Sequence, residues 1–77
     1  MSQRDRARRL RDARIGAGHD SARAAAKTFG WNINSYASNE NGNAPFSYSA
    51  AKKYAAAFGV TAEWLYDGKG APETDAA

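Results

Sequence analysis

Residues 21–42 read SARAAAKTFGWNINSYASNENG and carry the most informative pattern in the sequence. Ser21 and Asn32 are favoured N-cap residues, because a side-chain oxygen there accepts a hydrogen bond from an unpaired backbone amide one turn later. Gly30 stands where a residue with left-handed backbone angles would end the first of two helices. The pattern therefore predicts two short helices with only three residues between them, the second ending at an Asn-Gly pair.

The predicted second helix of this pair has an apolar and a polar face. Ala26 is small enough for the two helices to cross closely, and Tyr36 can pack against Trp31 around the Asn32 cap as a hydrophobic staple. A step of about 100° per residue places other side chains opposite Tyr36. The expected exposed positions are Asn34, Ala37, Ser38 and Asn41, with Ile33 at the exposed tip.

Apolar residues at helical spacing extend the fold to five short helices. The three further helices are expected from Arg4 to Ala17, from the cap Ser47 to Gly59, and from the cap Thr61 to Gly68. The inward positions of the five helices, apart from Arg14, are small or apolar: Ala7, Leu10, Ala13, Ala17, Ala22, Ala25, Ala26, Phe29, Tyr36, Ala51, Tyr54, Ala55, Phe58, Trp64 and Leu65. The sequence predicts an all-α, compact five-helix bundle over residues 1–70 and a polar tail over residues 71–77 that frays.

Composition excludes several classes of protein. The 77 residues suffice for one domain, and the lack of cysteine together with a single histidine excludes disulfides and argues against a zinc site or other cofactor. No apolar run approaches the roughly 20 residues of a membrane helix, so a cytoplasmic protein without a membrane partner is expected. There is no nucleophile with a paired base and no glycine-rich phosphate loop, so neither an enzyme nor a small-molecule ligand is expected.

The net charge of +3 conceals an uneven distribution. Basic residues crowd the start of the chain, at Arg4, Arg6, Arg8, Arg9, Arg11 and Arg14, whereas acidic residues are more frequent near its end. A basic face suits a polyanion such as DNA, because each neutralised phosphate releases counterions. A solvated helix without a partner accounts equally well for the charge alone.

Two helices joined by three residues are the sequence form of a helix-turn-helix. Three further pieces stand in register with it: Glu40-Asn41-Gly42, Phe58-Gly59-Val60 and the segment from Trp64 to Gly68. From about Arg9 to Gly68 the chain resembles the Cro and repressor family of lambdoid phages, also called the xenobiotic-response-element-like family. The resemblance implies a lambda-repressor-like fold and a phage- or prophage-type repressor that binds an inverted-repeat operator in double-stranded DNA, as a homodimer at least on DNA.

The resemblance also implies roles for individual residues. A buried ion pair is expected between Arg14 and Glu40. The positions that read bases are Ile33, Asn34 and Ser38, with Ala37 on the same face. Phosphates are expected at the start of the second helix and beside the end of the third, at Ser21, Ala22, Arg23, Asn41 and Asn43. The dimer contact is expected at Trp64 and Tyr66.

Some features depart from the family pattern. The turn after the first helix is one residue longer than in well-known phage repressors, and Ala22 replaces a phosphate-binding glutamine found in many relatives. Asn39 occupies a usually apolar position and needs a hydrogen-bond partner if it is buried. A protein interaction module, such as an antitoxin or adaptor that has kept this fold, is the alternative function. Met1 and the polar tail favour a complete regulator over the amino-terminal half of a longer repressor.

Overall fold

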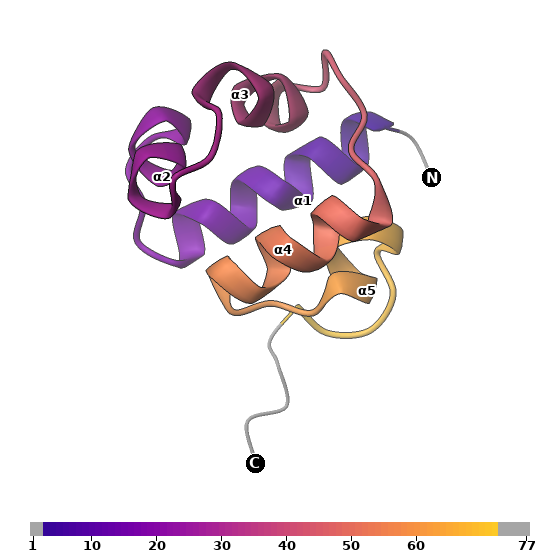
Figure 1. The fold of residues 1–77 in the computed structure, drawn as a ribbon. Coiled ribbons are helices and arrows are strands. Elements are labelled where there is room, and N and C mark those ends of the chain that lie inside the picture. The colour runs from indigo at the N-terminus through magenta and orange to yellow at the C-terminus, as the bar shows by residue number, and fades with distance from the viewer. Residues whose placement is uncertain (1–2, 73–77) are drawn as a thin grey trace.

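The computed structural model describes residues 3–72, which form five helices and no strand. The helices are α1 (Gln3–Gly16), α2 (Ala22–Phe29), α3 (Ile33–Asn41), α4 (Tyr48–Phe58) and α5 (Ala62–Asp67). The prediction of a compact all-helical bundle is therefore confirmed (Figure 1). No helix within these residues has both the length and the apolar composition needed to cross a bilayer.

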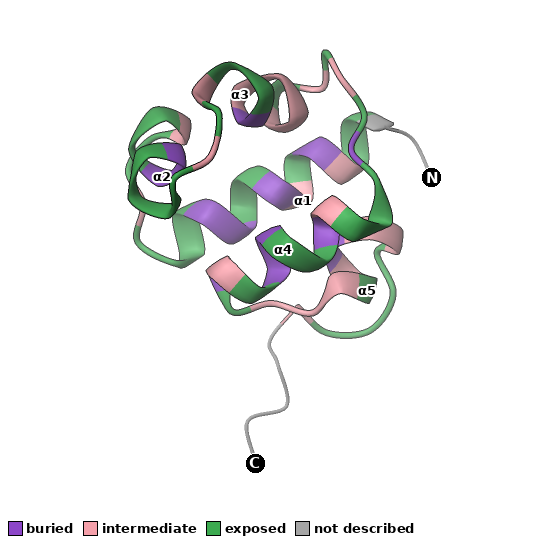
Figure 2. Cartoon of the chain, viewed as in Figure 1, coloured by how far each residue is buried: buried purple, intermediate pink, exposed green. Residues whose placement is uncertain are grey.

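Helix α1 is the central element and packs against each of the other four helices. Helices α2 and α3 pack together on one side of it, and α4 and α5 pack together on the other (Figure 1). Buried residues lie on the sides of the helices that face one another (Figure 2). Both halves of the molecule are thus joined through α1.

All four predicted caps are observed. The side chains of Ser21, Asn32, Ser47 and Thr61 each accept a hydrogen bond from the backbone amide three residues later. Gly30 ends α2 with φ of 73°, a value that favours glycine because a side chain would be strained there. The chain then turns within residues 30–32 and begins α3.

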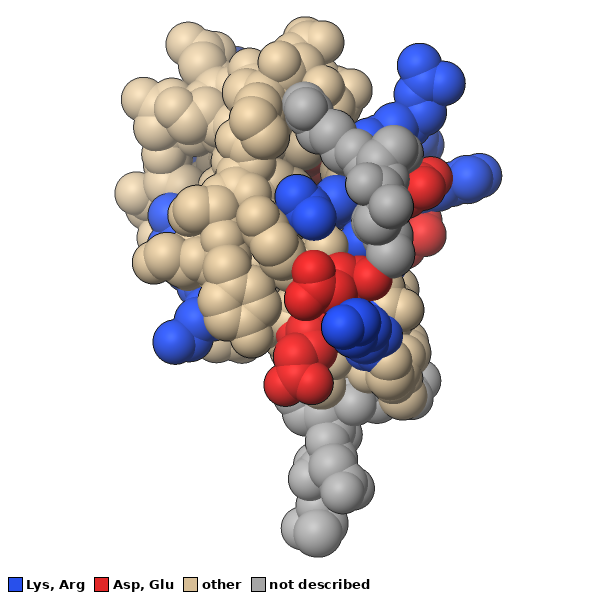
Figure 3. All heavy atoms as spheres, turned by 90° about the vertical axis from the view of Figure 1, so that its right-hand side faces the viewer, with Lys and Arg blue, Asp and Glu red and all other residues tan. Residues whose placement is uncertain are grey.

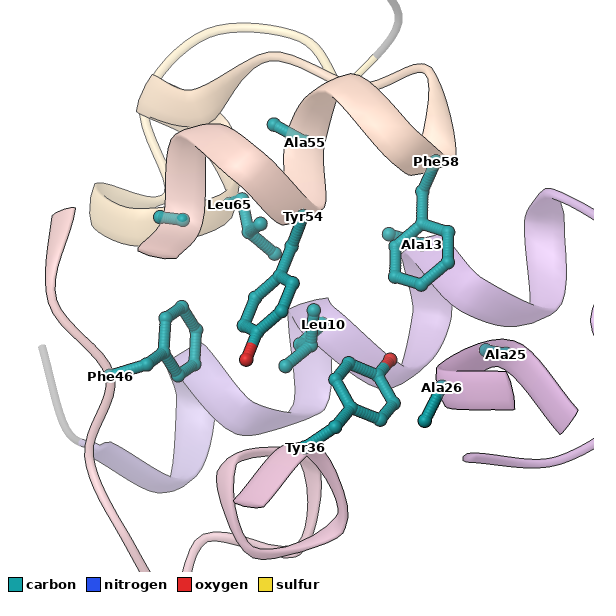
Figure 4. Close-up of a cluster of buried hydrophobic side chains, with 11 residues drawn as sticks. Leu10, Ala13, Ala25, Ala26, Tyr36, Phe46, Tyr54, Ala55, Phe58 and Leu65 are labelled. Atoms are coloured by element: carbon teal, nitrogen blue, oxygen red, sulfur yellow. The ribbon is translucent and has the colours of Figure 1, made fainter. Parts of the chain in front are cut away.

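The core joins all five helices, and its buried aromatic side chains are Tyr36, Phe46, Tyr54 and Phe58 (Figure 4). Tyr36 of α3 and Tyr54 of α4 meet edge to face with ring centroids 5.2 Å apart, and Trp31 packs on both rings. The contact of Trp31 with Tyr36, at 5.2 Å, confirms the predicted staple. The fully buried residues of the core are Leu10, Ala25, Ala26, Tyr36, Ala51 and Leu65.

Two predicted inward positions are wrong or only partly right. Ala17 is exposed, because α1 ends at Gly16 and Ala17 lies in the following turn. Phe29 is 37% exposed, because it lies at the edge of the aromatic cluster, where it stacks on Trp31 at 4.8 Å. Both residues stand at helix ends, where a repeating pattern no longer fixes the direction of a side chain.

The beginning of the predicted tail is bound to the bundle. The Thr61 amide donates to the carbonyl of Pro72 over 3.0 Å, and the Thr61 hydroxyl donates to that of Ala71 over 3.1 Å. Residues 73–77 of the predicted tail lie outside the described part of the chain. Residues 71 and 72 therefore extend the ordered structure beyond the predicted boundary at residue 70.

Candidate nucleic-acid interface

A buried ion pair fixes α3 on α1. Nε and Nη2 of Arg14 donate to the two carboxylate oxygens of Glu40 over 2.9 and 2.8 Å. The Arg14 and Glu40 side chains are only 7% and 9% exposed. The third nitrogen, Nη1, donates to the carbonyl of His19 over 2.8 Å and so binds the α1–α2 loop to the same pair. The hydrogen bond to Glu40 raises the pKa of Arg14, so the guanidinium remains charged.

The pair and the buried Tyr36 together set which face of α3 is outward. Tyr36 is 1% exposed, whereas Asn34 is exposed and Ser38 and Ala37 are half-buried. Three polar side chains thus form an outward ridge on α3, which we call the α3 ridge: Asn34, Ser38 and Asn41. The ridge offers amide and hydroxyl groups, which can both donate and accept hydrogen bonds, and carries no charge.

Hollows flank the α3 ridge on both sides. The loop-side hollow is lined by Asn34, Ser35, Ser38, Asn39 and Ala44. The three-helix hollow, on the other side, is lined by Arg11, Arg14, Ala22, Ala37, Glu40 and Asn41. The ridge residues therefore border two surface depressions.

The start of α2 opens on the three-helix hollow. Ser21 accepts from the Ala24 amide over 3.0 Å, and the Ser21 carbonyl accepts from Ala25 over 3.0 Å. The amides of Ala22 and Arg23 belong to the first turn, where no carbonyl of the same helix can reach them. They lie at the positive end of the helix dipole, which suits an anion. Ala22 lines the hollow, whereas Arg23 is exposed on α2 outside it.

The segment that follows α3 combines structural and exposed groups. The side-chain oxygen of Asn41 accepts from the Asn43 amide over 2.9 Å, which stabilises the turn after the helix. Both asparagines are exposed, and the amide nitrogen of Asn41 has no described partner. Asn41 also lines the three-helix hollow, so the structure brings it close to Ala22 and the helix start.

Asn39 has the partners that its position demands. Its side-chain oxygen accepts from the Tyr54 hydroxyl over 2.8 Å, and its nitrogen donates to the carbonyl of Ala44 over 3.1 Å. The residue thereby ties α3 to α4 and to the loop between them. Burial raises the pKa of Tyr54, which keeps this donor protonated.

Ile33 differs from the expected exposed tip. It is half-buried and packs against the core cluster. The cause is its place as the first residue of α3, since side chains lean toward the start of a helix and hence here toward the turn at Trp31. Part of the Ile33 side chain is therefore committed to the core.

The two residues expected at a dimer contact are both half-buried. The Tyr66 ring packs within the chain, with the Arg6 guanidinium 3.6 Å from its centroid and the Tyr48 ring at 5.4 Å. Trp64 lines a hollow with Phe58 of α4, with Val60 and Pro72, and with residues of α1.

Arg11 is the residue beside the ridge that sequence reasoning did not select. It is exposed and lines the three-helix hollow together with Ala22, Ala37 and Asn41. A signal was present, because helical spacing separates Arg11 from the inward Leu10 and Ala13. The run of arginines gave no indication of which of them would point toward α3.

Comparison with known proteins gives no relative of this chain: no family model, no curated protein and no solved structure matches it.

Proposed function

We propose that this chain is a sequence-specific transcriptional regulator that binds double-stranded DNA with a helix-turn-helix formed by α2 and α3. In this proposal the bundle is of the lambda-repressor type, and the protein is a phage- or prophage-type repressor. The observation that carries the proposal is the outward α3 ridge, held in a fixed orientation by the buried Arg14–Glu40 pair. The three-residue turn between α2 and α3 supports the same assignment.

The α3 ridge has the chemistry needed to read base edges in a major groove. Asn34 can bond N6 and N7 of adenine at once, and Ser38 can bond a donor or an acceptor. The exposed part of Ile33 and the Ala37 methyl can contact a thymine methyl. Because α3 carries no lysine or arginine, the proposed operator half-site is rich in A and T rather than read through guanine.

Phosphates are held on the three-helix side of the ridge in this proposal. The Ala22 and Arg23 amides, the Ser21 hydroxyl and the Asn41 amide group supply donors there, with Arg23 as a cation and Asn43 beside the turn. These contacts set the position of the protein on the duplex without selecting a sequence. Specificity then rests on the ridge.

A protein interaction module is the second candidate, favoured by the absence of a basic residue from α3. The two functions are distinguished by selecting bound sequences from a library of random duplexes. Enrichment of an A/T-rich half-site is expected of the regulator. A library that shows no enrichment, together with no salt-dependent binding to duplex DNA, would exclude DNA binding and leave the interaction module.

The role of Asn34 is tested on the selected duplex. Asn34→Ala is expected to weaken binding to that duplex by the roughly 1–3 kcal/mol of a bidentate contact, about 5- to 150-fold in affinity. Its affinity for random DNA should be unchanged. Arg23→Gln is the matched control and should weaken binding to the selected duplex and to random DNA by the same factor. Fluorescence anisotropy measures both, and equal losses for Asn34→Ala would remove Asn34 from the base-reading set.

The proposed regulator binds as a homodimer, because one short helix contacts only a few base pairs. The half-site centres should lie about one DNA turn apart, roughly 34–36 Å. Trp64 and Tyr66 are the proposed dimer contact. Sedimentation is measured for the protein alone and for its mixture with the selected palindrome, and the complex is expected to contain two chains per duplex. One chain per intact palindrome at saturation would contradict the dimer.

A further inference from the structure

The arginines of α1 fall into three groups, of which two have partners in the bundle. Arg6 and Arg9 donate to the last carbonyls of α5: Arg6 Nε to that of Tyr66 over 2.7 Å, and Arg9 Nε and Nη2 to those of Leu65 and Tyr66 over 3.1 and 3.0 Å. Arg14 is occupied by Glu40. The third group consists of Arg4, Arg8 and Arg11, which we call the arginine stripe.

The arginine stripe is exposed and lacks a partner within the described chain. Its members are four and three residues apart, so they share one face of α1. All three are exposed, and none forms an ion pair with another residue of the described range 3–72. The other two groups of arginines stabilise the bundle through their hydrogen bonds, whereas the arginine stripe makes no such contact within residues 3–72.

The arginine stripe is continuous with the proposed DNA interface. All three arginines line a hollow between α1 and the end of α3, to which Glu40 and Asn41 also contribute. Arg11 and Asn41 line the three-helix hollow as well, so the two hollows adjoin. Asp5 lies in the first hollow, and Arg14 neutralises Glu40, so positive charge remains in excess there.

We infer that the arginine stripe binds the phosphates of the DNA strand that borders the groove occupied by α3. From Arg4 to Arg11 the helix rises about 10 Å, which matches about three axial steps of roughly 3.4 Å between successive phosphates of one strand. Arginine forms two-pronged hydrogen bonds with phosphate oxygens, and its charge displaces counterions. In Figure 3, basic side chains project from one edge of the face with acidic side chains beside them, and further acidic side chains gather lower on the same face.

This inference rests on the proposed function, since it extends the same DNA interface onto α1. Its test uses a mixed-sequence duplex, for which no operator needs to be known. Affinity is measured by anisotropy from 50 to 200 mM salt for the wild type, for R8Q/R11Q and for R4Q/R8Q/R11Q. K52Q/K69Q is the matched control, because it removes two exposed charges from α4 and from the segment after α5. Thermal unfolding of each variant confirms its fold.

Each phosphate contact contributes about 0.9 to the slope of log affinity against log salt. R8Q/R11Q is therefore expected to lower the slope by about 2 and R4Q/R8Q/R11Q by about 3, with K52Q/K69Q near the wild type. The ratio of wild-type affinity to R8Q/R11Q affinity is therefore expected to fall about tenfold between 50 and 200 mM salt.

Three outcomes separate this inference from the proposed function. A wild type that binds duplex DNA with an unchanged slope in R8Q/R11Q overturns the role of the arginine stripe and leaves the proposed function standing. Equal changes of the salt slope in R8Q/R11Q and K52Q/K69Q also overturn the role of the arginine stripe, because they show an effect of net charge alone. A wild type that does not bind duplex DNA overturns both.

Discussion

Replacing Glu40 with methionine removes the carboxylate from the ion pair and leaves the Arg14 guanidinium, 7% exposed, without its counter-charge. Breaking a buried pair on one side costs roughly 3–5 kcal/mol. The pair borders the three-helix hollow, where water can reach part of it, so the lower end, about 3 kcal/mol, is expected. For 77 residues the whole free energy of unfolding is roughly 4–12 kcal/mol, so the loss is a large fraction of it.

Urea denaturation followed by circular dichroism measures this loss as a shift of the midpoint. Arg14→Met alone should also be destabilising, since it leaves the Glu40 carboxylate unpaired. The double variant R14M/E40M removes both charges together and is expected within about 1 kcal/mol of the wild type. Two results would refute the view that the two charges are coupled and desolvated. One is a loss of unfolding free energy in R14M/E40M that equals the sum of the two single losses, and the other is a loss below about 1 kcal/mol for Glu40→Met.

Two further predictions concern the tyrosines of the core. Tyr54→Phe removes the donor to Asn39 and is expected to lower the free energy of unfolding by roughly 1–2 kcal/mol in urea titrations, whereas an unchanged midpoint would show that this hydrogen bond adds nothing. Burial raises the pKa of both Tyr36 and Tyr54 above the unfolded value of about 10, so their contribution is complete below pH 10 and is lost as the pH rises through the folded values. Above about pH 10 the free energy of unfolding should fall by up to about 1.4 kcal/mol per pH unit per tyrosine, less steeply in Tyr54→Phe. A profile that stays flat from about pH 10 to 11 would contradict burial as the cause.

The sequence predicted the helices well because their ends are marked by local chemistry. Ser21, Asn32, Ser47 and Thr61 act through hydrogen bonds to amides three residues away, and that distance is readable along the chain. The inward direction of Tyr36 and the exposed Asn34 follow from helical spacing once the register is set.

Features that depend on contacts between distant segments could not be predicted in the same way. Asn39 needed a partner, but only the packing of α4 identifies it as Tyr54, 15 residues away. The division of the α1 arginines into three groups depends on where α5 and α3 dock. Partial burial of Ile33 depends on the shape of the turn before it. In each case the deciding neighbour is brought close by the tertiary fold alone.

The central position of α1 has a consequence for the order in which the chain acquires its structure. Pairing of α2 with α3, and of α4 with α5, joins segments that are neighbours in sequence, so little chain entropy is lost in closing those loops. The hydrogen bonds from Arg6 and Arg9 to the end of α5 instead join residues 56 to 60 positions apart. Docking of α1 therefore closes long loops within residues 3–72 and joins the two helix pairs into one bundle.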